Sequence, residues 1–268
     1  MELICPVCGE KLNRQDRSYV CPSRHSFDMA RQGYVNLLTV SQKHSLNPGD
    51  TREQVLSRRA FLEAGYYGPI LNTLIETAKE LGITGPIIDV GCGEGYYSAQ
   101  LAAALNAELM GFDISKEAVR CAAAKYKGPI WLTATASHIP VEKGAAQLLT
   151  SLFALTLPEE FARVLSDEGY YFQVLACQDH LLGLKSIIYD ELKFKEKDSM
   201  PELPGFALQK SIPIRFTFTV EGEQIQNLFS MTPHVFRIGK EGAERLKNTE
   251  ILTDTASCVL NVYCKVKN

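Results

Sequence analysis

Apolar residues along most of the chain alternate between two spacings. From Pro86 onward, short apolar runs typical of buried strands are separated by segments with helical spacing. This alternation predicts βαβ crossovers, and hence a parallel sheet with helices on both faces. We expect strands near 87–90, 109–112, 130–133, 148–153 and 170–175, and helices at 97–105, 116–126 and 159–165.

The two ends of the chain have different patterns. Residues 212–220 and 259–266 alternate apolar and polar positions, which predicts antiparallel strands at one edge of the sheet. Residues 1–36 are rich in cysteine and turn residues and read as a small separate module. The predicted organisation is therefore a module at 1–36, a segment at 37–82 with a linker or mobile loop (41–54) and two helices (51–62 and 68–81), and an α/β domain at 83–268.

Composition and charge narrow the functional classes. Hydrophobic residues make up 46% of the 268 and charged residues 22%, which is typical of a soluble globular protein. No apolar run is long enough to span a membrane, and the charged N-terminus predicts no signal peptide, so we expect a cytoplasmic protein. The net charge of −3 excludes nucleic-acid binding by bulk charge alone. Residues 1–60 nevertheless carry nine Lys/Arg against six Asp/Glu, which indicates either an anionic partner at the front or ordinary scatter of charge.

The strongest local signal is a set of metal-ligand residue types near the N-terminus. Cys5 and Cys8 form a Cys-x2-Cys pair, and Cys21 and His25 supply a second pair about a dozen residues later. This spacing lets two short turns close around one tetrahedral zinc ion. Four protein ligands leave no open coordination position, so the predicted zinc is structural. The alternative is chance clustering of free thiols.

A glycine-rich turn follows the first strand of the α/β domain. An apolar strand precedes Gly91, Gly93 and Gly95, and a helix follows them. Glycine is needed where the backbone turns sharply or where a ligand presses against the main chain. Asp113 ends the next expected strand, where a carboxylate can accept hydrogen bonds from ribose hydroxyls. The pattern predicts a nucleoside site at the carboxyl ends of the strands.

The spacing of the glycines decides between classes of nucleoside. A dinucleotide fingerprint would have its third glycine at position 96, which is Tyr96 here. Asp89, two residues before Gly91, is instead typical of the class I S-adenosylmethionine-dependent methyltransferases, which this stretch resembles. Asp89 would then bond near the loop or the cofactor's amino group, and the glycines would let the methionine portion lie against the backbone. The expected fold is a Rossmann-like, mostly parallel sheet with an antiparallel edge, preceded by a small zinc-binding domain.

The combination of zinc module and glycine loop resembles the bacterial 23S rRNA (guanine-N1)-methyltransferase family. The resemblance spans nearly the whole chain. The matching segments are Cys-Pro-Val-Cys at 5–8, then 21–28, 33–38, 48–50, 58–62, the glycine loop 89–97, and His180-Leu181.

The resemblance implies an N-terminal zinc domain that helps to recognise an rRNA hairpin, an S-adenosylmethionine-dependent methyltransferase domain, and often a homodimer. It implies that the zinc ligands are Cys5, Cys8, Cys21 and His25. It also implies cofactor contacts at Tyr67, at Glu94 with Gly95, and at His180. Tyr67 could alternatively be a packing residue at a helix start, and His180 a capping or core histidine.

The activity that the resemblance implies is methylation of guanine N1 in a hairpin loop of 23S rRNA. That nitrogen carries a proton at neutral pH, so a general base or a donor to O6 is needed. The sequence identifies no catalytic residue; Asp179 beside His180 is a conceivable pair, but such a step is more often structural or cofactor-binding. Candidate RNA contacts are Arg14, Arg17, Tyr19, Arg24, Arg31, Arg52, Arg58 and Arg59.

Three departures from the family pattern bear on the target. Leu155 replaces a proline in an aromatic-Ala-Pro element, Gln147 replaces an aspartate that begins a strand, and residues 166–169 replace a Pro-Gly-Gly-like turn. We expect these changes on the side of the cleft where the target base enters. They leave two alternatives open: a small-molecule methyltransferase with a structural zinc module, and a catalytically impaired RNA-binding homologue.

Overall fold

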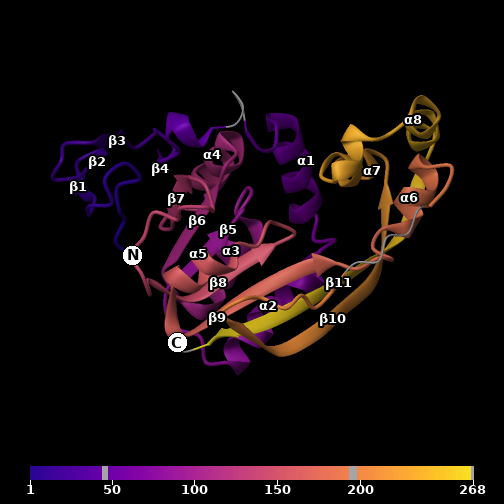
Figure 1. The fold of residues 1–268 in the computed structure, drawn as a ribbon. Coiled ribbons are helices and arrows are strands. Elements are labelled where there is room, and N and C mark those ends of the chain that lie inside the picture. Colours follow the sequence, from indigo (N-terminus) through magenta and orange to yellow (C-terminus); the bar gives the residue numbers. More distant parts are fainter. Residues whose placement is uncertain (44–47, 193–197, 267–268) are drawn as a thin grey trace.

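The large sheet of the molecule is mostly parallel. The computed structural model describes residues 1–43, 48–192 and 198–266, and Figure 1 shows its fold. Its main strands, in the order β10-β11-β9-β8-β5-β6-β7-β4, are β4 (Tyr34–Asn36), β5 (Ile87–Val90), β6 (Leu109–Asp113), β7 (Ile130–Thr133), β8 (Ala146–Leu152), β9 (Leu165–Ala176), β10 (Phe206–Glu221) and β11 (Ile251–Lys265). Neighbours from β4 to β9 are parallel, and β11 is antiparallel to both β9 and β10. This confirms the predicted sheet with an antiparallel edge.

Most of the helices alternate with the parallel strands along the sequence, as the apolar pattern predicts. They are α1 (Arg52–Glu63), α2 (Gly68–Glu80), α3 (Tyr96–Leu105), α4 (Lys116–Lys125), α5 (Pro158–Val164), α6 (Leu182–Ile188), α7 (Glu223–Ser230) and α8 (Lys240–Lys247), with 3-10 turns η1 (Val40–Gln42) and η2 (Pro233–Phe236). Helix α1 begins at a capping box, in which Thr51 and Gln54 exchange side-chain-to-backbone hydrogen bonds. Within the described residues, no helix is long and apolar enough to cross a membrane.

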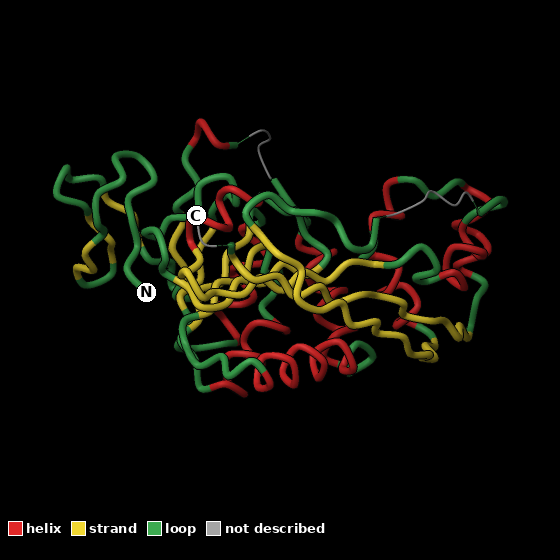
Figure 2. The backbone as a smooth tube through the Cα atoms, turned by 60° about the horizontal axis from the view of Figure 1, so that its bottom comes forward, coloured by secondary structure: helices red, strands yellow, loops and turns green. Residues whose placement is uncertain are grey.

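Two hydrophobic clusters cover the two faces of the sheet. Successive strand residues alternate between them: Ile87 and Leu109 belong to one cluster, and Ile88 and Met110 to the other. The first cluster includes buried residues of α2, α3 and α4, and the second includes those of α5 and of the N-terminal segment. The tube view in Figure 2 shows the strands as a layer with helices packed against it. The sheet is therefore buried on both faces, as a parallel sheet requires.

The N-terminal module is built into this architecture. Its strands β1 (Asn13–Gln15), β2 (Ser18–Val20) and β3 (Ser26–Asp28) form a separate antiparallel sheet. However, Leu3 bridges to Val141, and Ile4 N donates to Pro140 O at 2.9 Å. Strand β4 joins the large sheet beside β7. The module thus shares its core with the α/β domain, and the division at residue 36 stays a prediction.

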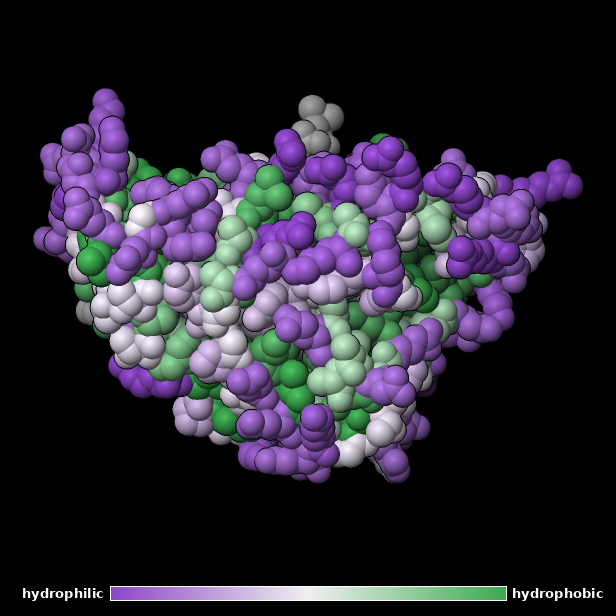
Figure 3. Space-filling view, turned by 180° about the vertical axis from the view of Figure 1, so that it is seen from behind, coloured by the Kyte–Doolittle hydropathy of each residue, from purple (hydrophilic) through white to green (hydrophobic). Residues whose placement is uncertain are grey.

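A long hairpin extends the sheet at the other end. Strands β10 and β11 pair from Phe206 opposite Lys265 to Glu221 opposite Ile251, and α6, α7 and α8 lie near the far end of this hairpin (Figure 1). Seen from behind in Figure 3, hydrophilic residues dominate the upper rim, and hydrophobic residues lie in patches lower on that face. The predicted linker or mobile loop at 41–54 falls partly outside the described residues, because 44–47 are not among them.

Candidate zinc and cofactor sites

Two tight turns bring the predicted zinc ligands together. In the first turn, Gly9 has φ +75° and its N–H donates to Cys5 O at 2.9 Å. In the second turn, Arg24 N donates to Cys21 O, and His25 N donates to Cys21 Sγ at 3.3 Å. A backbone N–H directed at a cysteine sulfur is the arrangement that a thiolate ligand requires.

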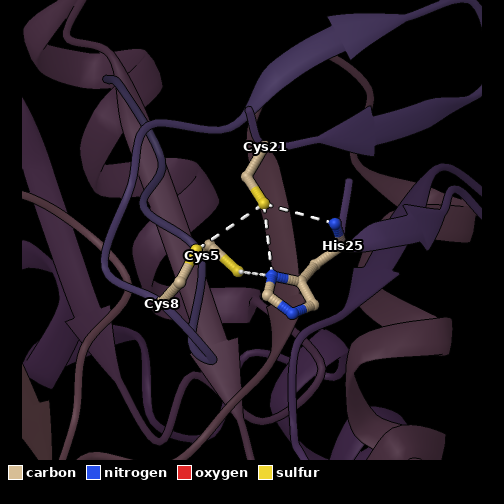
Figure 4. A group of neighbouring side chains, drawn as sticks. All are labelled: Cys5, Cys8, Cys21 and His25. Carbon is tan, nitrogen blue, oxygen red and sulfur yellow. Dashed lines mark hydrogen bonds between the residues drawn. The ribbon is translucent and has the colours of Figure 1, made fainter. Parts of the chain in front are cut away.

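The four donor atoms are spaced for one tetrahedral ion. The ligand atoms of Cys5, Cys8, Cys21 and His25 all lie within 4.8 Å of one another (Figure 4). The Sγ atoms of Cys8 and Cys21 are 3.6 Å apart, and His25 Nδ1 is 3.6 Å from Cys5 Sγ and 3.3 Å from Cys21 Sγ. Tetrahedral zinc places two sulfurs about 3.8 Å apart, and a sulfur and a nitrogen about 3.5 Å apart. The donor set fits a structural zinc, with Nδ1 as the histidine ligand.

The glycine loop leaves space beside one of its buried glycines at the carboxyl end of β5. Gly93 has φ +56°, and among the described residues that do not flank it, a Cβ built on it would meet Arg58 Nη1 alone within 4 Å, at 3.9 Å. Gly91, with φ +69°, packs instead against Ala154, whose Cβ would lie 2.9 Å from an added Cβ. Gly91 is exposed and Gly93 is buried, so a ligand that lies against Gly93 would occupy a covered space beside Arg58.

Gly95 serves a different purpose, because it makes room for a buried tryptophan. A Cβ on Gly95 would lie 2.7 Å from the ring of Trp131, and one on Gly111 would lie 2.3 Å from the same ring. Trp131 is 2% exposed, and its Nε1 donates to Tyr126 O at 2.9 Å. The third glycine thus lets the loop and the start of α3 pack closely against β7.

Three carboxylates surround the loop, and burial raises the pKa of each. Asp89 is 4% exposed and accepts a hydrogen bond from Thr150 Oγ1 at 2.6 Å; burial, partly offset by this bond, raises its pKa to about 7. Burial also raises the pKa of Asp113, while its bonds from Ser115 N at 2.8 Å and Gly93 N at 3.0 Å lower it. Glu94 behaves similarly, with Arg58 as the opposing charge.

Tyr67 and His180 meet at the same edge, although 113 residues separate them. Ser257 N donates to His180 Nδ1 at 3.1 Å, which leaves the proton on Nε2, 3.4 Å from the Tyr67 hydroxyl. Tyr67 is 2% exposed and burial raises its pKa. Asp179 forms an ion pair with Arg215, and hydrogen bonds from Ser257 and Arg215 lower its pKa. In this arrangement Asp179 pairs with Arg215, whereas His180 bonds with Ser257 and Tyr67.

The cofactor fit rests on the space beside Gly93 and on buried polar atoms. Within the described part of the chain, the hydroxyls of Tyr97 and Thr133 are buried and have no hydrogen-bond partner. Thr133 is the register partner of Asp113 across β6 and β7. Space beside the backbone, a carboxylate and unsatisfied hydroxyls at the carboxyl edge of a parallel sheet suit a nucleoside with a polar side chain, such as S-adenosylmethionine.

Arg58 lies at this site although it was not among the predicted cofactor residues. Its helical spacing suggested a solvent-facing cation for RNA, whereas the structure directs its guanidinium toward Gly93 and into an ion pair with Asp50. Burial alone would lower the pKa of Arg58, but the carboxylates of Asp50 and Glu94 outweigh burial and raise it. The Pro48-Gly49-Asp50 segment could have indicated that Arg58 lies at the site, because it belongs to the family pattern and lies near Arg58 in sequence.

Two of the three departures from the family pattern lie away from the cleft. Gln147 is the second residue of β8, and its Oε1 accepts hydrogen bonds from Thr84 N and Gly85 N, before β5. Residues 166–169 follow the start of β9, where an added Cβ on Gly169 would lie 3.2 Å from Gln147 O. Both positions are at the amino edge of the sheet, so the prediction that they face the target base is wrong. The Phe153–Leu155 element does lie at the carboxyl edge, beside the glycine loop.

The strand order, the glycine loop and its acidic neighbours define a class I methyltransferase, and a model described as "Methyltransferase domain" matches residues 87–169. A model described as "RlmA, N-terminal" matches residues 3–46. A provisionally named type II methyltransferase structure from Anaeromyxobacter dehalogenans is similar in fold, with TM-score 0.52 and 14% identity, covering 74% of this chain and 96% of that one.

Relatives of known name identify the family. The chain is 35% identical to the 23S rRNA (guanine(748)-N(1))-methyltransferase of Streptomyces fradiae over 68% of its own length and 66%, just under two thirds, of that protein. A provisionally named 23S rRNA (guanine-N1)-methyltransferase of Micromonospora griseorubida is 35% identical, covering 68% of each chain. A provisionally named relative from Bacillus subtilis is 26% identical over 91% of this chain and 90% of that one. The chain belongs to the 23S rRNA (guanine-N1)-methyltransferase family, and its cofactor is S-adenosylmethionine.

Proposed function

We propose that this protein methylates N1 of a guanine in 23S rRNA. The observation that carries the proposal is the coexistence, in one chain, of a closed four-ligand zinc site and a glycine loop with space beside Gly93, whose N–H donates to Asp113. The Streptomyces fradiae relative bears the name of this activity and is 35% identical over 68% of this chain. The location of the Gln147 and 166–169 departures at the opposite edge of the sheet supports a working target site.

The residues around the loop have distinct proposed roles in holding the reactants. Bound S-adenosylmethionine supplies an electrophilic methyl group on a positively charged sulfur. Asp113, held by two backbone N–H groups, is oriented to accept the ribose hydroxyls. Gly93 lets the methionine portion approach the main chain, Asp89 and Glu94 offer buried carboxyl groups beside the loop, and Gly91 and Gly95 shape the loop. Tyr67, oriented by His180, directs its hydroxyl toward the same edge.

The rate enhancement in this scheme comes mainly from positioning. The buried surroundings of Tyr67, Asp89 and Glu94 exclude water, which strengthens the charge interactions in the site. Phe153 has φ +55°, is 43% exposed and has its ring 6.1 Å from that of His180. It gives the mouth of the site an exposed aromatic surface at the carboxyl end of β8.

The proposed RNA partner is a hairpin loop, because its unpaired bases expose the Watson–Crick edge that carries N1. The zinc module would contribute to its recognition through its basic residues. The proposed location is the cytoplasm, where rRNA is assembled. A homodimer is part of the same proposal, and light scattering of the purified protein measures it: a single-chain mass of 29.8 kDa would contradict the dimer.

The test of the proposed function is methylation in vitro of 23S rRNA from cells that lack the gene. Methylation at N1 blocks Watson–Crick pairing, so reverse transcription should stop next to one guanine after incubation with protein and S-adenosylmethionine. The matched control is the same RNA incubated with protein carrying Gly93→Val, whose side chain fills the space beside the loop. The proposal would be contradicted if protein that holds zinc and binds the cofactor produced no such stop at any guanine.

A further inference from the structure

Arg58 lies on α1, and its side chain extends to the glycine loop. Its guanidinium forms an ion pair with Asp50, and its Nη2 donates to Met231 O at 3.3 Å. Asp50 is itself fixed, because Ser115 Oγ donates to its backbone oxygen at 2.7 Å. The side chain of Arg58 is 26% exposed. Contacts to two separate segments therefore hold its position in front of the loop.

The direction of this side chain distinguishes it from a surface cation. Among the described residues that do not flank Gly93, Arg58 Nη1 alone lies within 4 Å of a Cβ built on Gly93, at 3.9 Å, so Arg58 borders the space that a ligand would occupy. A guanidinium has five N–H donors in a planar fork, a geometry that matches a carboxylate. The contacts to Asp50 and Met231 leave donors available toward Gly93.

The charges around Arg58 select the kind of anion that it can receive. Glu94 and Asp113 lie close enough to act on its charge. A polyanion such as an RNA backbone would meet these carboxylates with no compensating positive charge. S-adenosylmethionine carries one carboxylate together with an ammonium and a sulfonium, so its charges complement one arginine among several acids.

We propose that Arg58 binds the carboxylate of the cofactor's methionine portion, with Asp50 and the Met231 carbonyl orienting the guanidinium. This rests on the assigned cofactor and is independent of the RNA target. It makes Arg58 a cofactor-binding residue that lies outside the glycine-loop domain. It also explains why α1, which follows the zinc module in sequence, lies against the loop.

The test is a thermodynamic cycle between a side chain and a ligand group. Binding of S-adenosylmethionine and of decarboxylated S-adenosylmethionine, which lacks only the carboxylate, is measured by calorimetry for wild type and Arg58→Gln, without RNA. A charge-assisted pair predicts about 10- to 100-fold weaker binding of the complete cofactor by the variant. The decarboxylated cofactor should bind both proteins within about twofold. Equal losses for both ligands would overturn the proposal and indicate a purely structural arginine.

Two further variants keep the test decisive. Arg120→Gln removes an arginine that is paired with Glu117 on α4, and we expect it to bind both ligands like wild type. Should Arg58→Gln fail to fold, Arg58→Lys retains a positive charge, and we expect it to weaken binding of the complete cofactor selectively. Unchanged affinity of Arg58→Lys for both ligands would contradict the forked contact. Because no RNA is present, failure of the rRNA activity cannot be confused with failure of this inference.

Discussion

Replacing Asp89 by asparagine tests the electrostatic state of the strand that leads into the glycine loop. Asp89 is 4% exposed, and its Oδ1 accepts a 2.6 Å hydrogen bond from Thr150. Burial raises the pKa of Asp89 from 3.8 to about 7, with the Thr150 bond acting in the opposite direction. Asparagine keeps the shape and the acceptor oxygen of this side chain but cannot ionise.

The sign of the effect follows from proton linkage. Below about pH 4, the carboxyl is protonated in both the folded and the unfolded chain and adds no pH dependence. Between that pH and a pH of about 7, the unfolded chain is ionised while the folded chain keeps its proton. The folded state therefore loses about 1.4 kcal/mol of stability for each pH unit as pH rises. Above the folded pKa, this loss levels off at roughly 4 kcal/mol.

We expect the free energy of unfolding of Asp89→Asn, minus that of wild type, to increase by about 2–3 kcal/mol between pH 5 and pH 8. Urea unfolding across this range measures the difference, in which the titration of Glu94, Asp113 and other shared groups largely cancels. Thr150→Val should raise the pKa of Asp89 further, so that the loss of stability with rising pH continues to a higher pH. A difference that does not change with pH would show that Asp89 is ionised throughout, and would refute the reasoning.

Three further substitutions separate stability from binding. Gly111→Ala places a Cβ 2.3 Å from the ring of Trp131 and should lower the free energy of unfolding by about 1–3 kcal/mol in urea titrations; an unchanged midpoint would contradict it. Gly93→Ala should cost only about 1–2 kcal/mol for its φ of +56° and weaken S-adenosylmethionine binding in calorimetry, and wild-type affinity would show that no ligand lies there. Cys8→Ser should abolish stoichiometric zinc in elemental analysis. It should also lower the melting temperature of the whole chain, because Cys5 and Cys21 belong to one of the two core clusters of the sheet. Two separate melting transitions would contradict a shared core.

The strands and helices of the α/β domain could be predicted because their signals are local. Strands β5 and β7 occupy the predicted residues 87–90 and 130–133, since each is a short, mostly apolar run between turn signals. The pairing of β4 with β7 could not be predicted in this way. A three-residue strand has no measurable period, and its partner lies almost a hundred residues away. Residues of the module expected at 1–36 pack into a core cluster of the α/β domain, and the boundary at residue 36 stays a prediction.

The candidate sites show the same distinction between local and tertiary information. The four zinc ligands could be predicted from spacing alone, because short turns dictate how cysteine pairs meet. Arg58 could not, since its direction depends on how α1 docks against the loop and Met231. Gln147 was assigned to the wrong edge, although its position before an apolar run places it at the amino end of β8. Ligands of open α/β sheets bind at the carboxyl ends, so strand direction alone would have corrected that assignment.

Residues 48–51, which lie between the zinc module and α1 in the sequence, contact the cofactor site. Gly49 has φ +81°, and an added Cβ there would lie 2.8 Å from the Cβ of Ser115. Ser115 holds the segment through Asp50 O and holds the Asp113 carboxylate through its own N–H, so one residue contacts both. Displacement of residues 48–51 by bound RNA would thus move the neighbours of Asp113 and Arg58 together. If RNA displaces this segment, we expect RNA binding and cofactor affinity to be coupled, and any such coupling is reciprocal by thermodynamic necessity.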